Sequence, residues 1–499
     1  MSHDYDVVVI GAGPVGATAL AFLGHAGIRA VAVERDLEQW TTARAVHFDG
    51  ETIRTLQGLG LSERASALCR PMTNVLMENE AHEVLFDLPT GRLGAQAWHD
   101  DLMFHQPEME AVFREDIASL PSVELRTGTG LTAIGQDEDE VRCLVEDADG
   151  AASVITARWV IACDGATSTV RRLLDIPTER IGSDDPWLVV DGLLHEGPGM
   201  AADMAFLGHY SRPALWARMT GNRVRMEFKV MPGDDLNEIV TPPAIERISH
   251  GLLPEAHFEP DRVAIYTFRA RVAERWRVGR VFLAGDAAHQ APPLFGQGLC
   301  AGMRDVVNLT WKLRLVARGL AEDDLLDTYE SERRAHARYW VEQAATMATL
   351  VQTTDPQVAA GRDAYIREHP EASVPPAPPL GPGLHRGPAD AQAGRLSVQP
   401  VLGDGTRLDD LVGPRFLVAA EPSLVRALAN ATRSALDSDP ETVVFTDPGK
   451  VGDLLAAAGR AAVIVRPDHY ILGTADSAAE LQGLLNLVPT LNLPAAQPA

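Results

Sequence analysis

The stretch from Val281 to Met303 carries residue types whose spacing could do chemistry. Its first four residues are apolar and predict a buried strand, which ends at Gly285-Asp286, where a carboxylate can accept hydrogen bonds from a polyol. Gly296-Gln297-Gly298 lets the backbone approach a flat ligand, and the residues from Leu299 to about Ala317 predict a helix. The N-terminus of that helix would direct N–H groups and the positive end of its dipole at the ligand, which suits the negative charge of a reduced flavin.

The same stretch supplies the candidates for catalysis. Pro292 and Pro293 stiffen the loop before the glycines, and Pro293 is also a candidate for substrate contact. His289 lies three residues past Asp286 and could tune the site, with a structural histidine as the alternative. For the whole stretch, the alternative is a loop whose glycines and prolines serve the turn alone. We predict catalytic roles for Pro292, Gly296, Gly298 and His289, and cofactor contacts for Asp286, Gly298, Leu299 and Cys300.

A second glycine-rich motif lies near the start of the chain. The run Asp6–Ile10 predicts a strand, Gly11-Ala12-Gly13-Pro14-Val15-Gly16 opens a helix, and a second strand ends at Glu34. This is the βαβ dinucleotide-binding pattern, in which the three glycines allow a tight turn, close approach to a pyrophosphate and close helix packing, and the acid can hold ribose hydroxyls. The pattern does not distinguish FAD from NAD. We predict cofactor contacts for Gly11, Gly13, Pro14, Gly16, Glu34 and Arg35.

Further polar residues fall where a cofactor could meet them. Arg44 follows the first βαβ unit, where it is either a solvated charge or a contact to the cofactor. Gln106 stands at the start of a predicted helix, either as a cap or as a cofactor contact. Asp164-Gly165 follows the apolar strand Trp159–Cys163 and leads into a helix, although Asp-Gly turns are common anywhere. We predict that Arg44, Gln106, Asp164 and Gly165 contact the cofactor.

Residues 180–279 predict an antiparallel sheet that covers the cofactor-binding part, with an earlier excursion at residues 72–97. Aromatic side chains on this sheet could line a flat pocket, and arginines could pair with a substrate carboxylate. Core packing for the aromatic residues and solvent-facing positions for the arginines are the alternatives. The substrate candidates are His209, Tyr210, Trp216 and Arg225, together with Pro293.

The end of the chain predicts a separate unit. Residues 370–388 hold seven prolines, which is typical of a linker or of a segment that wraps a domain. From about Leu396, strands and helices alternate in a compact α/β unit without cysteine. The fold class is therefore α/β, with a Rossmann-like domain interrupted by an antiparallel substrate sheet. The predicted boundaries are 1–71, 98–179 and 280–369 for the first domain, 72–97 and 180–279 for the substrate-binding domain, 370–395 for the linker and 396–499 for the C-terminal domain.

The composition argues against several classes of function. A formal net charge of −25 over 499 residues disfavours binding to nucleic acid or to an anionic membrane surface. The four cysteines are far apart and form no CxxC, so we expect neither structural zinc nor a disulfide framework, and no metal site. The first fifteen residues lack a basic leader, and no apolar stretch approaches about 18 residues. We therefore expect a cytoplasmic protein without a membrane span.

The three motifs together, Gly11-x-Gly13-x-x-Gly16, Asp164-Gly165 and Gly285-Asp286, resemble those of the FAD-dependent aromatic hydroxylases, a family of flavoprotein monooxygenases. The stretches Ala43–Asp49 and Gly296–Asp305 are similar to the 3-(3-hydroxyphenyl)propionate hydroxylase branch. The resemblance implies that the predicted cofactor is FAD and that NADH or NADPH and O2 are co-substrates. It also implies a thioredoxin-like C-terminal domain and a homodimer. Many family members carry asparagine where this chain has Cys300.

By this resemblance, the chain would hydroxylate a phenolic ring through a C4a-hydroperoxyflavin, with 3-(3-hydroxyphenyl)propionate or a related phenol as the small aromatic substrate. A polyketide-tailoring or Baeyer–Villiger flavin monooxygenase is the alternative on the same fold. A non-catalytic flavin-binding partner protein is a more remote one. The absence of CxxC argues against a disulfide reductase. The sequence does not identify the base that activates the phenol.

Overall fold

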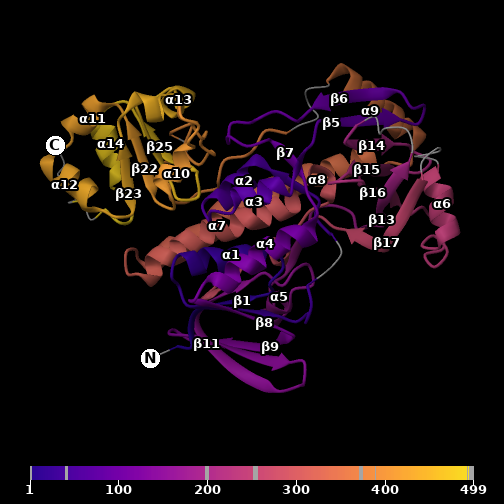
Figure 1. Ribbon diagram of the computed structural model, residues 1–499, viewed down its shortest axis with the longest axis horizontal. Helices are drawn as coiled ribbons and strands as arrows, with labels where there is room; N and C mark the ends of the chain where they lie inside the picture. The colour runs from indigo at the N-terminus through magenta and orange to yellow at the C-terminus, as the bar shows by residue number, and fades with distance from the viewer. Residues whose placement is uncertain are drawn as a thin grey trace.

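The computed structural model describes residues 3–39, 43–196, 202–250, 257–369, 375–387, 389–491 and 493 (Figure 1). Its first layer is an eight-stranded sheet with five neighbouring parallel strands. The central strands β1 and β2, the second half of β11 and β20 are mostly apolar and buried, as parallel strands covered by helices require, whereas β8 at the edge is polar and partly exposed. The parallel strands are, in spatial order, β20 (Val281–Leu283), β11 (Ala152–Ala162), β1 (Tyr5–Ile10), β2 (Ala30–Glu34) and β8 (Val123–Thr127). β10 (Val141–Asp147) pairs antiparallel with β11, β19 (Arg277–Val278) pairs antiparallel with β20, and β9 (Thr129–Gln136) pairs antiparallel with β10.

The register of this sheet brings the three distant motifs together. Ile10 of β1 pairs with Ala162 of β11, and Ala162 pairs with Leu283 of β20. Because the strands are parallel, the residues that follow them emerge at one edge of the sheet. Gly11, Asp164 and Gly285 are therefore neighbours in space, although they are spread over more than half of the chain.

Two long helices cross the centre of the molecule behind this edge. Helix α7 (Gln297–Ala317) is buried over nearly its whole length and packs between α1 (Pro14–His25) and α8 (Asp327–Val351). It begins two residues before the predicted start because Gly296, with φ 63°, turns the chain into it. The short elements around it are α4 (Gln106–Ser119), α5 (Thr169–Leu173), η1 (Gly285–Ala287), η2 (Pro293–Phe295), η3 (Asp323–Leu326), β12 (Thr178–Arg180), β18 (Arg271–Ala273) and β21 (His289–Gln290).

The second layer is a seven-stranded sheet, at the right of Figure 1. Its pairs are antiparallel except for β5 with β14, which run parallel. One face packs on α6 (Pro242–His250) through an apolar cluster, and the other faces the first layer. Its strands, in order, are β17 (His257–Phe268), β13 (Asp185–Glu196), β16 (Arg223–Lys229), β15 (Ala214–Arg218), β14 (Met204–Gly208), β5 (Asn74–Asn79) and β6 (Val84–Pro89), and α9 (Pro356–Glu368) lies along β6.

A small sheet and two helices connect these layers. The sheet has the order β3 (His47–Asp49), β7 (Asp101–Met103), β4 (Arg70–Pro71), and α2 (Gly50–Gln57) and α3 (Ser62–Ala67) follow β3. Asp49 caps α2, because its side chain accepts a hydrogen bond from the N–H of Thr52 at 2.9 Å. This connection places the loop before β3 between the two large sheets.

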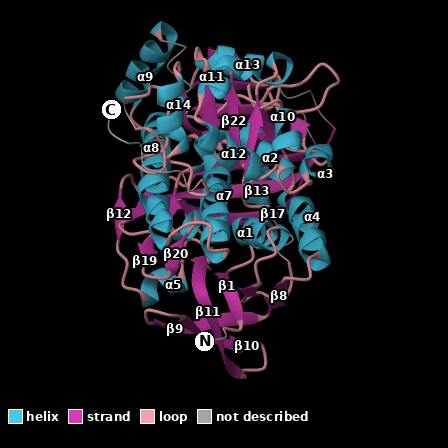
Figure 2. Ribbon diagram, turned by 90° about the vertical axis from the view of Figure 1, so that its left-hand side faces the viewer, coloured by secondary structure: helices cyan, strands magenta, loops and turns pink. Residues whose placement is uncertain are grey.

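The C-terminal unit lies at the left of Figure 1, and Figure 2 shows α7 between it and the sheet of β1 and β11. Its four strands have the order β23-β22-β24-β25, with β22 and β23 parallel and the other pairs antiparallel. This mixed sheet is thioredoxin-like, so the predicted fold class is confirmed throughout the chain. Its elements are α10 (Leu408–Val412), β22 (Phe416–Ala420), α11 (Pro422–Ala427), α12 (Asn430–Ser438), β23 (Thr442–Phe445), α13 (Pro448–Ala458), β24 (Ala462–Val465), β25 (Ile471–Ala475) and α14 (Ala478–Leu485).

The proline-rich segment is a wrapping segment where the structure describes it, rather than a free linker. Leu380 donates its N–H to Gly394, and Gly381 donates to the carbonyl of Glu332 on α8. Arg386 donates its N–H to Leu472 of β25. Residues 370–374 and 388 of the predicted linker lie outside the described residues. Among the described helices, none is long and apolar enough to cross a membrane.

A buried charge network joins the C-terminal unit to the centre of the molecule. Glu332 of α8 has no exposed surface and accepts hydrogen bonds from Lys312 at 2.7 Å and from Arg466 at 2.8 Å. Asp468 binds the same guanidinium at 2.6 Å. Despite its burial, the two cations hold the pKa of Glu332 well below its usual range. One carboxylate therefore neutralises one cation from each unit.

We expect Glu332→Gln to lower the free energy of unfolding by about 3–5 kcal/mol, because it leaves two buried cations with too little negative charge. Urea unfolding of the FAD-saturated protein, followed by circular dichroism, measures this change. Asp476→Asn is the matched control, because Asp476 pairs with Arg460 at an exposed site. Equal losses in the two variants would contradict the assignment of the network as a structural junction.

Candidate active site

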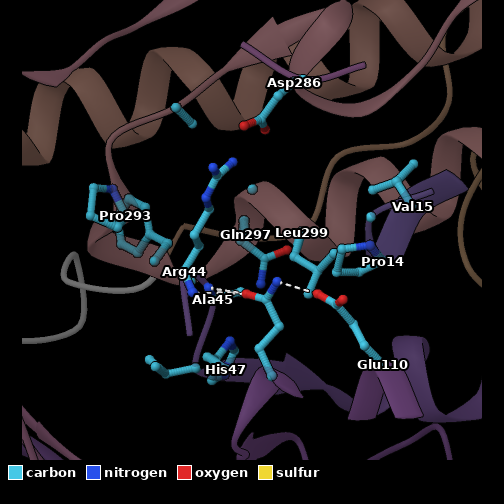
Figure 3. A pocket seen from close by; sticks show the side chains of 18 of the residues that line it. Pro14, Val15, Arg44, Ala45, His47, Glu110, Asp286, Pro293, Gln297 and Leu299 are labelled. Atoms are coloured by element: carbon cyan, nitrogen blue, oxygen red, sulfur yellow. Dashed lines mark hydrogen bonds between the residues drawn. The ribbon is translucent and has the colours of Figure 1, made fainter. Parts of the chain in front are cut away.

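A single elongated cavity of about 780 Å³ runs along the edge of the first sheet to the inner face of the second (Figure 3). This volume is within the range of pockets that enclose large organic ligands, about 300–1,000 Å³. Its walls come from the β1–α1 turn, the end of β2, the Arg44–His47 segment, the start of α7 and the strands of the second layer. The cavity thus joins every motif that we singled out in the sequence.

The β1–α1 turn forms one end of the cavity, and its glycines are explained by close approaches. Gly11 has φ 89°, and a Cβ there would lie 2.6 Å from the carbonyl oxygen of Cys163. A Cβ on Gly16 would lie 1.9 Å from the carbonyl oxygen of Gly11. A Cβ on Gly13 would meet no protein atom within 4 Å, so this side of the turn is left open toward the cavity. Pro14, Glu34 and Arg35 also line this end, and Glu34 accepts a hydrogen bond from the N–H of Ala12 at 2.8 Å.

The start of α7 forms the middle wall. Gly296 is its N-cap and offers no side-chain cap, so the first N–H groups of the helix are not bound by a capping side chain. Gln297, Gly298 and Leu299 line the cavity there. These N–H groups and the helix dipole give the wall a positive character without a charged side chain. This is the arrangement that the sequence predicted for the negative charge of a reduced flavin.

The side chain of Gln106 positions the segment that carries Arg44. Its Oε1 accepts hydrogen bonds from the N–H groups of Arg44 at 2.9 Å and of Ala45 at 2.8 Å. Its Nε2 donates to Glu110 at 2.6 Å, and burial raises the pKa of that carboxyl. Figure 3 shows the Arg44 side chain crossing the cavity toward Asp286. Gln106 therefore acts by holding the backbone from which Arg44 projects.

Two carboxylates from the sequence motifs face the cavity. Asp164 caps α5, accepting the N–H of Thr169 at 2.7 Å with one oxygen, while its buried Oδ1 has no partner among the described residues. Asp286 opens onto the cavity, yet the protein surrounds it so closely that desolvation raises its pKa. The positive charges of His289, Arg44 and Arg171 oppose this rise without cancelling it. Both carboxylates keep acceptor capacity for a ligand.

His289, predicted as catalytic, lies outside the cavity wall and binds Asp305, a residue that sequence reasoning missed. Asp305 of α7 is fully buried and accepts hydrogen bonds from the N–H of Gly285 at 3.0 Å and from His289 at 2.8 Å. Arg333 of α8 donates to its other oxygen at 3.0 Å. His289 also stacks on Trp276 with ring centroids 5.3 Å apart, and it does not line the cavity.

Other predicted residues also lie outside the cavity wall. Pro292 lines a separate small pocket, and the Cys300 thiol is buried against the carbonyl of His47. His209 bonds to Glu78 at 3.1 Å, in a cluster with His82 away from the cavity. Trp216 packs in the apolar cluster on the α6 side of its sheet, because side chains alternate between the faces of a strand. Tyr210 does not line the cavity either, so we do not carry Pro292, His209, Tyr210 or Trp216 forward as ligand contacts.

Arg225 does line the cavity, but its N–H donors are already engaged by the protein. Its guanidinium binds Asp191 at 2.7 and 2.9 Å and has 4 % of its surface exposed. The same group donates to the carbonyls of Ala43 and Arg44, both at 2.6 Å. Arg225 thus ties the second sheet to the Arg44 segment and has no free charge for a substrate carboxylate. The signal that could have indicated this, Asp191, lies 34 residues earlier in the sequence.

A second histidine, His47, was not singled out in the sequence and faces the cavity. Its Nε2 bonds to Asp101 at 2.9 Å, and its buried Nδ1, which has no partner among the described residues, lies against Gly296. Burial would lower the pKa of this ring, but the hydrogen bond to Asp101, with the Cys300 thiol nearby, outweighs it and raises the pKa to about 10. The ring is therefore cationic at neutral pH, next to the start of α7.

The far half of the cavity is lined mainly by apolar side chains from the second sheet, the η2 turn and α8. The charged residues on this part of the sheet are Arg225, which pairs with Asp191, and Glu227, which has no such partner. Pro293, a predicted substrate contact, lies at the border between the halves (Figure 3). The apolar lining consists of Val75, Phe86, Leu88, Met204, Phe206, Leu215, Ala217, Leu294, Phe295, Trp340 and Met347.

The residues present fit a bound flavin dinucleotide. The open cradle at Gly13 and the start of α1 suit a diphosphate. Asp286 offers acceptors midway along the cavity, and the start of α7 offers donors beyond it. A dinucleotide-binding fold whose cavity continues into a mainly apolar half is an arrangement that suits an oxidoreductase with a dinucleotide cofactor.

Comparison with known proteins agrees with this class. Residues 4–344 match the model of the FAD binding domain family. The chain is 34% identical to a probable NADH-specific resorcinol 4-hydroxylase of Rhodococcus jostii (strain RHA1), over 96% of this chain and 93% of that one. It is 31% identical to a 3-(3-hydroxy-phenyl)propionate/3-hydroxycinnamic acid hydroxylase of Escherichia coli O8 (strain IAI1), over 95% and 92%. The chain therefore belongs to the FAD-dependent aromatic hydroxylase family of flavoprotein monooxygenases.

Solved structures share the complete fold. The flavin-dependent monooxygenase PieE, solved with FAD and substrate, superposes with a TM-score of 0.82 at 21% identity, over 99% of this chain and 100% of that one. Aklavinone-11 hydroxylase, solved with FAD and aklavinone, superposes with a TM-score of 0.80 at 22% identity, over the same shares. At these identities the likeness shows the fold alone, including the C-terminal unit.

Replacing Gly13 separates ligand binding from folding. We expect Gly13→Ala to weaken FAD binding at least tenfold with an unchanged unfolding midpoint of the apoprotein, because the added Cβ meets no protein atom but would occupy the open cradle. Fluorescence titration of the apoprotein with FAD measures the affinity. Gly361→Ala, in an exposed part of α9 where a Cβ also meets nothing, is the control. Unchanged FAD affinity in Gly13→Ala would place the diphosphate elsewhere.

Proposed function

We propose that this enzyme uses FAD, NADH or NADPH, and O2 to hydroxylate the ring of an uncharged phenol. The overall reaction is phenol, O2, NAD(P)H and a proton giving the hydroxylated phenol, NAD(P)⁺ and water. The observation that carries the proposal is the division of the cavity into a half that suits the flavin and an apolar half that suits an uncharged ring. Small phenols are the substrate class because both curated relatives act on them by name.

Particular residues would hold FAD. Gly11, Gly13 and the start of α1 would bind the diphosphate, and Glu34 would bind the ribose of the adenosine. Asp286 would bind the ribityl chain, and the start of α7 would stabilise negative charge on the flavin ring. When bound, FAD supplies the redox chemistry, taking a hydride from the nicotinamide and delivering one oxygen atom of O2 to the ring. His47, cationic at neutral pH, adds positive charge beside the start of α7.

The apolar half would orient the ring and keep water away from the reacting oxygen. Phe206, Leu215 and Leu294 belong to one buried cluster that joins the second sheet, the η2 turn and the end of α8. A planar substrate between this cluster and the flavin would be enclosed on both faces. Exclusion of water protects the activated oxygen and strengthens the electrostatic interactions within the site.

The charges of the cavity favour a substrate without a carboxylate. On the sheet that lines the apolar half, Arg225 donates to Asp191 and to two backbone carbonyls, whereas the carboxyl of Glu227 has no hydrogen-bond partner among the described residues. Arg92, near the mouth, pairs with Asp100 at 3.0 Å. A phenylpropionate would bring a negative charge to this half, whereas a dihydroxybenzene would bring only hydrogen-bonding groups. We therefore favour a substrate of the resorcinol kind over 3-(3-hydroxyphenyl)propionate.

The purified yellow protein tests the proposal directly. We expect resorcinol to accelerate NADH oxidation and to yield a product heavier by one oxygen, detected by mass spectrometry. 3-(3-Hydroxyphenyl)propionate at the same concentration should give a kcat/KM at least tenfold lower, because its carboxylate would enter the half of the cavity that holds the buried carboxyl of Glu227. NADPH is compared with NADH in the same assay.

Two outcomes would contradict the proposal at different levels. A higher kcat/KM for the phenylpropionate would overturn the substrate class and leave the monooxygenase assignment standing. Faster NADH oxidation with every phenol, but without an oxygenated product, would overturn ring hydroxylation itself.

A further inference from the structure

Glu227 is a buried carboxyl that makes no hydrogen bond or ion pair with the residues that the structure describes. It lies on β16, on the face of the sheet that lines the cavity. Its partners in register are Leu215 of β15 and Val189 of β13, both apolar. Leu215 packs with Leu294 of the η2 turn, just before the start of α7. The carboxyl therefore belongs to the wall of the apolar half, across from the turn that leads to the flavin side.

The carboxyl oxygens of Glu227 lack hydrogen-bond partners among the described residues. The residue has only 4 % of its surface exposed, and its Oε2 is buried without a partner. A buried polar group without a partner costs free energy, so such groups are rare unless a ligand completes them. The other lining residues around Glu227 are mainly apolar, so a bound substrate could supply the hydrogen bond that its carboxyl lacks.

The charges around Glu227 come from its own strand and from two neighbouring strands. They are Arg225 on β16, Asp191 on β13 and Arg262 on β17. Arg225 and Arg262 share the single carboxylate of Asp191, at 2.7 and 2.8 Å, so these four groups together carry no net charge when Glu227 is ionised. Burial, helped by Asp191 and opposed by the two arginines, raises the pKa of Glu227 to about 7.

We propose that the carboxylate of Glu227 binds the hydroxyl of the phenolic substrate and takes its proton. This proposal rests on the proposed function and supplies the base that the hydroxylation needs. The phenol O–H bond breaks, a new O–H bond forms on the carboxylate, and the electron pair stays on the phenolate oxygen. The phenolate is more electron-rich at its ortho and para carbons, where the electrophilic oxygen adds.

The raised pKa makes Glu227 a better base for a phenol than an ordinary carboxylate. Phenols of the tyrosine type have a pKa of about 10, and ordinary glutamates about 4.3. A group with a pKa of about 7 closes roughly half of that gap while remaining deprotonated in a useful fraction at neutral pH. Burial, and not a hydrogen bond to a particular residue, brings the pKa of Glu227 closer to that of a phenol.

Other titratable groups that line the cavity are less suited to this role. His47 is already protonated at neutral pH and bonded to Asp101, so it has no lone pair ready to accept a proton. Asp286 lies on the flavin side, and Asp100 is paired with Arg92 near the mouth. Glu227 alone among these groups combines an apolar setting with unoccupied acceptors.

The test compares Glu227→Gln with the wild type on a phenol that the wild-type enzyme hydroxylates. We expect FAD content and the unfolding midpoint to stay unchanged, and the rate of product formation to fall about 100-fold or more. In the wild type, kcat/KM should rise with pH through about 7, because the carboxylate is the active form. This rising limb should be absent in Glu227→Gln.

A second substrate distinguishes a base from a merely structural carboxyl. The second substrate is a nitrophenol, assayed at a pH where it is already ionised in solution. On it, the ratio of the Glu227→Gln rate to the wild-type rate should be at least tenfold higher than on the un-ionised phenol. The absorbance of the nitrophenolate also reports directly whether the bound phenol is ionised. Glu78→Gln, on β5 of the same sheet but outside the cavity, is the matched control and should behave as the wild type.

The outcomes separate this inference from the proposed function. If the wild type hydroxylates no phenol, the proposed function fails whatever Glu227 does. If the wild type hydroxylates and Glu227→Gln keeps the same rate and pH profile, the role of Glu227 is overturned. If Glu227→Gln loses FAD, the pH profile is measured on Glu227→Asp instead, and a limb that does not move from its wild-type position would overturn the proposal.

Discussion

The buried carboxylate of Asp305 is the constraint on which the site depends. It lies within α7, with no exposed surface, and it binds the backbone of Gly285, the ring of His289 and the guanidinium of Arg333. The residue after Gly285 is Asp286, and the start of α7 is the opposite wall of the cavity. One side chain thus fixes the position of Asp286 relative to the N-terminus of α7. A buried carboxylate is stable only when hydrogen bonds and an opposite charge compensate for the loss of water, so the partners of Asp305 must keep their positions as well.

The same helix carries a second link, which reaches the C-terminal unit. Arg304 binds Asp49, binds Glu51 at 2.5 Å, and donates to Gln297 at 2.9 Å at the start of α7. The hydroxyl of Tyr470 donates to Glu51 at 2.9 Å from the C-terminal unit. Tyr470 of the thioredoxin-like unit thus supports Glu51, Glu51 binds Arg304, and Arg304 contacts Gln297 at the start of α7. This unit, which has no cysteine, therefore serves the site by packing. This accounts for a domain that keeps its fold without its redox chemistry.

Motifs whose residues are contiguous in the sequence could be located from the sequence alone, whereas contacts between side chains far apart in the chain could not. Gly11-x-Gly13-x-x-Gly16, Asp164-Gly165 and Gly285-Asp286 each follow an apolar strand, so the strand–turn–helix pattern was enough to find them. Parallel pairing then brings the three strand ends together, as this fold requires. By contrast, nothing near His289 reveals that Asp305 fixes it, and nothing near Arg225 reveals Asp191.

The faces of the second sheet show why the substrate residues were missed. Trp216 and Leu215 are adjacent, yet one packs on α6 and the other lines the cavity. Alternation predicts that they face opposite ways, but not which face meets the cofactor. Glu227 gave no sequence signal at all, because a glutamate on a strand is usually solvent-facing. Its proposed role is inferred only from its burial and from the lack of a hydrogen-bond partner among the described residues.

The charge balance of the apolar half explains why an uncharged phenol and a base at Glu227 belong together. Two like unit charges 4 Å apart at an effective dielectric of 20 repel by about 4 kcal/mol, so a carboxylate substrate beside an ionised Glu227 would bind poorly. Proton transfer from a neutral phenol avoids this cost. It leaves a neutral acid and a phenolate, so the half still holds one negative charge, displaced by the length of a hydrogen bond. The N-terminus of α7 and the raised pKa of His47 give the flavin side of the cavity a positive character, and this field would favour the ionised form of a phenol bound there.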